Sequence, residues 1–145
     1  MSRCNLTQTD FVLFNGDMLS FINSEDQLFK GFMDTAVRLF ASEIPMYYAR
    51  GNHETRGVFA TEIQRYFSPC QEHLYYAFRQ GPVYCIVLDT GEDKPDSDIE
   101  YAGITQYDLF RTEQSEWLAS ILESTEYKEA PFKIIVAHIP PAVTE

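Results

Sequence analysis

The apolar and polar positions of the first forty residues predict a buried strand followed by an amphipathic helix. Residues 10–14 hold a short apolar run that ends in an Asn-Gly-Asp turn, a pattern typical of a buried parallel strand. From Ser24 to about Ser42, apolar side chains recur every three or four positions, which predicts a helix with one broad apolar face. Ser24 with Gln27 three residues later forms a capping-box pattern, which predicts where this helix begins.

The rest of the chain continues this alternation of strand-like and helix-like segments. The predicted elements are, in order, a strand at 44–49, a short helix at 58–67, a hairpin with strands at 74–79 and 83–89, a helix that begins at Thr112 or a neighbouring residue, and a strand at 132–137. The acidic stretch 92–100 is predicted to be an exposed loop. This alternation indicates an α/β protein built from layers of strands and helices.

Composition and charge narrow the class of protein. The chain has 145 residues, of which 45% are hydrophobic and 14% aromatic, so it can form one globular domain with a real core. No apolar run reaches the about 20 residues that a membrane-spanning helix needs. The formal net charge of −11 disfavours nucleic acid and anionic lipid as partners. An acidic protein that handles phosphate needs a local positive charge, which bound metal ions would supply.

The three cysteines, Cys4, Cys70 and Cys85, have no CxxC spacing, and we interpret them as free or buried thiols. A disulfide among them would require an oxidising compartment. The first ten residues contain no apolar segment of the kind found in signal peptides, and the sequence leaves the compartment open.

Asp17 belongs to the first of three groups of polar residues that follow predicted strands. Because ligand sites in open α/β sheets form beyond the carboxyl ends of strands, we expect the three groups to converge. One carboxylate can bridge two divalent ions about 3.5–4 Å apart, an arrangement that clamps the attacking and leaving oxygens of a phosphoryl group. The alternative is that Asp17 only stabilises the turn after its strand.

The stretch Gly51-Asn52-His53-Glu54 follows the second predicted strand and is the most specific of the three groups. The amide oxygen of Asn52 is a neutral hard ligand that suits a divalent ion already bound to a carboxylate. His53 beside it can contact a phosphate oxygen and protonate the leaving group. The alternative is an ordinary turn with incidental polar residues.

His138 follows the last predicted strand, which favours a metal ligand over a histidine of the core. Neutral imidazole suits Zn, Fe, Mn or Co, so the identity of the metal stays open. Arg50 and Arg56 flank the Asn-His pair and are candidates for binding a phosphate oxygen. Their alternative role is an ion pair with a local acid such as Glu54, and His73 is interpreted as a surface or packing residue.

Taken in order, Gly16-Asp17, Gly51-Asn52-His53-Glu54 and His138 resemble the motifs of the calcineurin-like metallophosphoesterases. The motifs of that superfamily run DxH, GDx, GNH followed by an acid, a lone His after an apolar strand, and GHxH. Gln114 with Trp117-Leu118 also resembles the helix that precedes the lone-His strand. The resemblance covers nearly the whole chain and implies part of a four-layer α/β/β/α sandwich with mixed sheets.

The resemblance implies a metal-dependent phosphoester hydrolase with two divalent or trivalent metal ions, such as Fe, Mn or Zn. Asp17 would bridge both metals, and Asn52 and His138 would bind the second one. His53 would be the catalytic acid and the phosphate contact, while a metal-bridging hydroxide would attack phosphorus in line. The implied substrate is a small-molecule phosphomonoester or phosphodiester. Glu54 would orient His53 or a neighbouring loop.

Two departures from the family pattern shape the prediction. No DxH motif precedes Asp17 and no GHxH motif follows His138, so we interpret residues 1–145 as a partial catalytic domain that is truncated at both ends and inactive alone. The alternative is a non-catalytic binding module on a degenerate metallophosphoesterase fold. The stretch at 50–56 looks closest to bacterial members similar to purple acid phosphatases, but positions 18–22 contain no tyrosine for a purple-type iron site.

Overall fold

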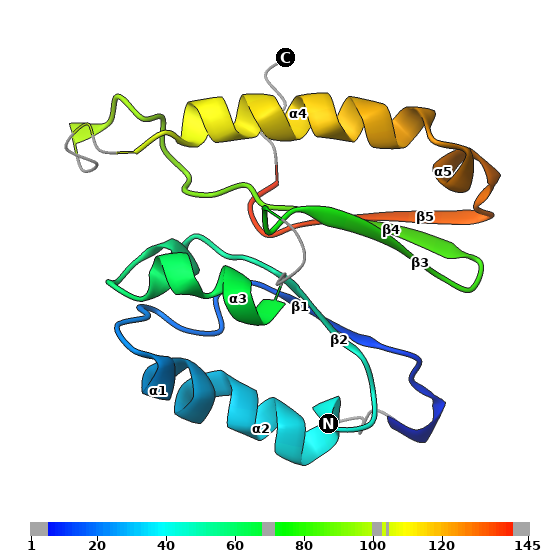
Figure 1. Cartoon of the computed structure of the whole chain (residues 1–145), viewed down its shortest axis with the longest axis horizontal. Helices are drawn as coiled ribbons and strands as arrows, with labels where there is room; N and C mark the ends of the chain where they lie inside the picture. The colour runs from blue at the N-terminus through cyan, green and yellow to red at the C-terminus, as the bar shows by residue number, and fades with distance from the viewer. Residues whose placement is uncertain (1–5, 68–71, 100–102, 104, 141–145) are drawn as a thin grey trace.

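The computed structural model describes residues 6–67, 72–99, 103 and 105–140. Two small sheets face each other, with helices on their outer sides (Figure 1). The first sheet pairs β1 (Val12–Asn15) with β2 (Met46–Ala49) in parallel. The second sheet has the order β3–β4–β5, with bounds Tyr76–Gln80, Val83–Leu88 and Phe132–Ala137. The α/β class and the predicted strands are therefore confirmed.

The two sheets differ in how their strands run. β3 and β4 form the predicted antiparallel hairpin, whose turn contains Gly81 with a positive φ of 56°. β5 then returns parallel to β4, so the second sheet is mixed. In the first sheet Asn15 pairs with Ala49, so β1 and β2 end level with each other. Both strands consequently deliver their following turns to the same edge.

The helix predicted from Ser24 is continuous but contains π-helical turns. Its segments, in order, are α1 (Glu25–Leu28), η2 (Phe29–Met33), α2 (Asp34–Ala36) and η3 (Val37–Ala41). The Ser24 side chain accepts a hydrogen bond from the Gln27 backbone N–H, as the capping pattern predicts. The Gln27 side chain accepts from the N–H of Asn23, one residue earlier than in the standard motif.

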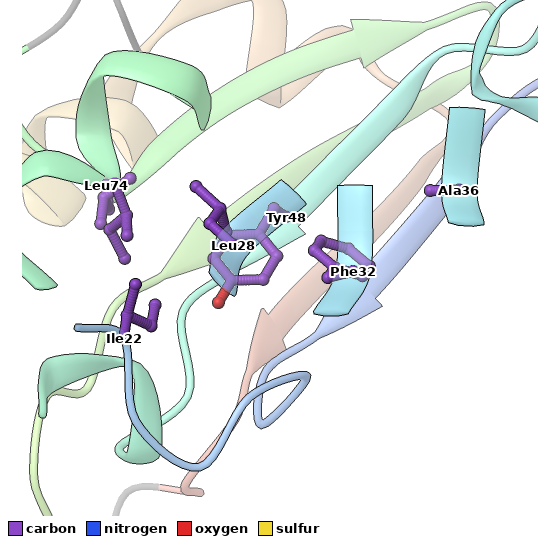
Figure 2. Close-up of a cluster of buried hydrophobic side chains, with 7 residues drawn as sticks. Ile22, Leu28, Phe32, Ala36, Tyr48 and Leu74 are labelled. Carbon is purple, nitrogen blue, oxygen red and sulfur yellow. The ribbon is translucent and has the colours of Figure 1, made fainter. Parts of the chain in front are cut away.

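The apolar face of this helix packs against the first sheet. Ile22, Leu28, Phe32, Ala36, Tyr48, Ile63 and Leu74 form this buried cluster. Figure 2 shows Leu28, Tyr48 and Phe32 side by side at its centre. Between the two sheets, Ala49, Tyr76 and Val87 form a second buried cluster. Burial of this apolar surface stabilises the strands whose ends carry the polar turns.

Helix α4 (Tyr107–Glu123) lies over the second sheet (Figure 1). The prediction that it begins near Thr112 was wrong, because the helix begins five residues earlier, at Tyr107. Gln106 makes no side-chain cap, and the carboxylate of Asp96 instead accepts hydrogen bonds from the N–H groups of Tyr107 and Asp108 at 2.8 and 2.9 Å. A cap supplied from a distant loop leaves no local sequence signal.

Short helical turns fill the connections. They are η1 (Leu6–Gln8), η4 (His53–Thr55), η5 (Ala60–Glu62), α3 (Gln64–Phe67) and α5 (Thr125–Glu129). Of the cysteines, Cys85 is a buried free thiol, whereas Cys4 and Cys70 lie outside the described residues. Among the described residues, no helix is both long and apolar enough to cross a membrane.

Candidate metal and phosphate site

The turns after β1 and β2 meet backbone to backbone at two glycines. A Cβ atom on Gly16 would lie 2.5 Å from His138 Nδ1 and 2.6 Å from the Cα of Gly51. Gly16 has a φ of 74°, and Asp17 has a φ of 57°, the only positive value among the described non-glycine residues. Such a backbone is strained for a residue with a side chain and persists only where its surroundings enforce it. The Asp17 carboxylate faces the turn after β2, where it accepts a hydrogen bond from a backbone N–H.

The three groups of polar residues converge on the Asp17 carboxylate, as predicted. Its Oδ1 accepts a hydrogen bond from the His53 backbone N–H at 3.2 Å. Its Oδ2 lies 3.2 Å from His138 Nε2 and 3.9 Å from His53 Nε2. Residues that are far apart in sequence therefore present one carboxylate and two imidazoles to a single region.

The ring of His138 is oriented by a backbone carbonyl. Its Nδ1 lies 2.7 Å from the Asn15 carbonyl oxygen, which can only accept a hydrogen bond, so Nδ1 carries the proton. In the neutral imidazole, Nε2 then presents a lone pair to Asp17 Oδ2 at 3.2 Å. Two acceptors at this separation repel each other unless a cation or an added proton lies between them. This donor set fits a metal ion.

The Glu54 carboxylate links the turn after β1 to the turn after β2 through hydrogen bonds. Its side chain is buried, with 1% of its surface exposed. Oε2 accepts hydrogen bonds from the N–H groups of Asp17 and Gly51 at 2.8 and 3.0 Å, and Oε1 accepts from Leu19 at 2.9 Å. Of the two roles implied by the resemblance, the structure shows the contact with a neighbouring loop. Burial raises the pKa of the Tyr48 phenol, and the adjacent Glu54 charge raises it further.

The comparison with protein families shows which family the chain belongs to. The family model described as calcineurin-like phosphoesterase matches residues 3–144. The chain belongs to the calcineurin-like phosphoesterase family. Phosphoesterases are hydrolases, and members of this family typically bind two metal ions. No curated protein and no solved structure matched the chain.

In this phosphoesterase-family chain, the two arginines predicted to bind phosphate, Arg50 and Arg56, are engaged in ion pairs. Arg50 Nη2 lies 2.8 Å from Oδ2 of Asp89, whose side chain is 1% exposed. The charges pair at this distance, but their alignment leaves Arg50 Nε and Asp89 Oδ2 without a hydrogen-bond partner among the described residues. Arg50 also lines a cleft of about 400 Å³ beside the first turns of α4. Phosphate binding by Arg50 stays a prediction.

Arg56 makes a bidentate pair with Glu92, at 3.0 Å from Nε to Oε1 and 3.1 Å from Nη2 to Oε2. Burial alone would raise the pKa of the Glu92 carboxyl, but the hydrogen bonds from Arg56 and Thr55 and the Arg56 charge outweigh burial. The net pKa is below the ordinary value, so Glu92 is ionised at neutral pH. The prediction of an exposed loop from residue 92 was therefore wrong at Glu92, which is 7% exposed.

Sequence reasoning missed Asp89 and Glu92 as neighbours of the site. Asp89 is buried after β4, where its N–H and carbonyl pair with the side-chain amide of Gln114 at 2.7 and 2.8 Å. A usable signal was present, because Asp89 and Glu92 also follow an apolar strand. It was weak because five acids crowd the stretch 92–100 and suggest a solvated loop.

The available ligands set a limit on the site. Within residues 6–67, 72–99, 103 and 105–140, no group of three or more His, Cys, Asp or Glu side chains is arranged to hold a metal ion. Asp17 and His138 are two side chains of this kind that lie close together. The predicted roles of Asp17, Asn52 and His138 as metal ligands therefore stay predictions.

Proposed function

We propose that this chain carries part of the active site of a metal-dependent phosphoester hydrolase. Asp17, Asn52 and His138 would hold one metal ion, and Asp17 would bridge it to a second. The observation that carries the proposal is the 3.2 Å separation of His138 Nε2 from Asp17 Oδ2, with the other ring nitrogen, Nδ1, held 2.7 Å from the Asn15 carbonyl oxygen. A divalent ion between Nε2 and Oδ2 would be bound by both atoms, and Fe, Mn or Zn would suit the mixed oxygen and nitrogen ligands.

When bound, the metal would supply Lewis-acid stabilisation of the charge that develops on the phosphoryl oxygens. His53 has a separate task. Its Nε2 is 3.9 Å from Asp17 Oδ2, too far for a hydrogen bond, and its side chain is 38% exposed. The ring is therefore available to contact a phosphate oxygen. Its backbone N–H remains fixed on Asp17 Oδ1, which ties the acid to the metal-binding carboxylate.

In the proposed hydrolysis, a P–O bond forms to the oxygen of water as the P–O bond to the leaving group breaks. The proton on His53 Nε2 passes to the leaving oxygen, and water supplies the proton that restores the imidazolium. The substrate is a phosphomonoester or phosphodiester. The net charge of −11 favours a small substrate over a long polyanion. Arg50 and Arg56 would orient a phosphate oxygen only by exchanging their present carboxylate partners.

The test measures metal binding and hydrolysis separately. Because no group of three or more His, Cys, Asp or Glu side chains among the described residues is arranged to hold a metal ion, we expect hydrolysis of an aryl phosphate by the 145-residue chain to be slow. Mn²⁺ binding, measured by calorimetry, should be saturable in the wild type and lost in Asp17→Asn. His53→Ala should keep Mn²⁺ binding and lower any Mn²⁺-dependent rate by about 100-fold. Equal Mn²⁺ affinity in the wild type and Asp17→Asn would refute the proposed metal site.

The second candidate function is a non-catalytic binding module. The incomplete ligand set among the described residues favours it. It predicts a folded chain in which His138 is protonated and forms an ion pair with Asp17 instead of sharing a metal. NMR of the His138 ring nitrogens distinguishes the two, because an imidazolium carries protons on both nitrogens and a metal ligand on one.

A further inference from the structure

We propose that Glu92 is a positioning residue that sets the orientation of the Asn52 side-chain amide, so that the amide oxygen is presented to the metal. This inference rests on the proposed function, in which Asn52 is a metal ligand. It adds a residue from the segment after β4 to a site otherwise built on the turns after β1 and β2 and on His138, which follows β5.

Glu92 is placed to act as an acceptor of four hydrogen bonds. Its side chain is 6% exposed, and both carboxylate oxygens are engaged. Oε1 lies 3.0 Å from Arg56 Nε and 2.8 Å from the Thr55 hydroxyl. Oε2 lies 3.1 Å from Arg56 Nη2 and 3.5 Å from Asn52 Nδ2. All three donor residues belong to the turn that contains the Asn-His pair.

The chemistry of the two groups fixes the direction of the amide. Both Glu92 oxygens accept hydrogen bonds from the Arg56 guanidinium, so the carboxylate faces Asn52 as an acceptor, and the Asn52 group 3.5 Å from Oε2 is the NH₂. The amide oxygen then points away from Glu92, and oxygen is the atom that a hard metal ion binds. A flipped amide would place two acceptors against each other at a partly buried position, which is costly. Glu92 therefore selects one of the two amide orientations.

Glu92 is itself held from helix α4. The Arg111 guanidinium donates to the carbonyl oxygens of Thr90 and Glu92 at 3.2 and 3.1 Å. Gly91 has a φ of 64°, and a Cβ there would lie 2.6 Å from the Tyr107 ring. The segment can therefore approach α4 only with glycine at that position. Helix α4 thus fixes the position of the Glu92 carboxylate relative to the Asn52 side chain.

A double-mutant cycle tests the inference with Mn²⁺ as the probe. Glu92→Gln should weaken Mn²⁺ binding by about 10-fold, the lower end of what outer partners of metal ligands contribute. In the double variant Asn52→Asp/Glu92→Gln, the donor and the acceptor exchange positions. The introduced glutamine amide can donate to the introduced aspartate carboxylate, whose two oxygens are equivalent. In the background of Asn52→Asp, Glu92→Gln should therefore not weaken Mn²⁺ binding. Glu62→Gln, which removes a surface partner of Arg65, is the matched control and should bind Mn²⁺ like the wild type.

A purely structural role for Glu92 predicts the same loss of affinity in both backgrounds, and that result would overturn the inference. Circular dichroism and urea unfolding establish that each variant is folded. If Glu92→Gln does not fold, the wild type still decides the question by NMR. The Asn52 side-chain NH₂ protons should exchange with solvent at least about 10-fold more slowly than those of exposed Asn23. Equal exchange rates would rule out the contact.

These outcomes separate this inference from the proposed function. If the wild type binds no Mn²⁺, the proposed metal site fails, and the amide exchange rates alone judge the Glu92 contact. If the wild type binds Mn²⁺ but the cycle shows no coupling between residues 52 and 92, the metal site stands and the role of Glu92 fails.

Discussion

The turn at residues 15–19 and the segment at residues 89–92 both border the candidate metal site, but they are held in different ways. The turn is fixed through its backbone, by glycine contacts and by the N–H groups of Asp17 and Leu19, which donate to Glu54. The segment is fixed largely through side chains, by Gln114 and Arg111 of helix α4. Backbone packing leaves little room for substitution, whereas side-chain contacts can be altered one at a time. Substitutions in the turn should therefore lower the free energy of unfolding the most.

Gly16→Ala should produce the largest effect. The new methyl group would meet His138 and Gly51 and would occupy a backbone with a φ of 74°. Strain and overpacking together should lower the free energy of unfolding by about 4 kcal/mol, measured by urea unfolding. Gly81→Ala is the control, because Gly81 also has a positive φ but no neighbour within 4 Å, and should cost about 1 kcal/mol. Equal losses would show that the turns do not touch as described.

Glu54→Ala should lower the free energy of unfolding by about 3 kcal/mol, since it leaves the N–H groups of Asp17, Leu19 and Gly51 without their acceptor. Mn²⁺ affinity should fall with it, because the same groups set the position of Asp17. Glu62→Ala, on the surface, should change stability by less than about 0.5 kcal/mol. If Glu54→Ala unfolded at the same urea concentration as the wild type, that result would disprove that Glu54 holds the two turns together.

Gln114→Ala should have an intermediate effect and should act on the segment rather than the turn. The substitution leaves the buried N–H and carbonyl of Asp89 unpaired and should cost about 2 kcal/mol. Gln106→Ala, at the N-cap position without a side-chain cap, should be nearly neutral. A Gln114→Ala variant as stable as Gln106→Ala would mean that α4 does not hold the segment.

Asp96→Asn should have the smallest effect, one that depends on pH. Burial would raise the pKa of Asp96, but hydrogen bonds from the N–H groups of Asp108 and Tyr107 and from the Thr105 hydroxyl outweigh it and lower the pKa below its ordinary 3.8. A carboxyl group whose pKa is lower in the folded state stabilises the protein at pH values above its ordinary pKa. This stabilisation is lost as the pH falls through the folded-state pKa. Melting temperatures of the two proteins should differ at about pH 6, and the difference should shrink only as the pH falls below the ordinary pKa of 3.8. A difference in melting temperature that does not change with pH would contradict the role of the Asp96 carboxylate as the N-terminal cap of α4.

The sequence predicted the strands and the convergence of the site because these depend on local patterns. An apolar run that ends in Gly16-Asp17 or in His138 specifies both a strand and the polar residue at its end. The contacts of Glu92 depend on residues 36 to 40 positions earlier and on a helix that follows it. No local pattern encodes such separations. The start of α4 was misplaced for the same reason, since its cap comes from Asp96 in a preceding loop.

The central claim is that Asp17 and His138 share a metal ion, and a Mn²⁺ titration of the wild type and two histidine variants tests it most directly. The wild type should bind Mn²⁺ saturably, and His138→Ala should bind it at least about 100-fold more weakly, since a direct ligand contributes no less than its outer partners. His73→Ala is the matched control, because His73 stacks on Tyr75 at 4.6 Å and has no contact with Asp17 among the described residues. It should bind like the wild type. Equal Mn²⁺ affinity in the wild type and His138→Ala would contradict the account.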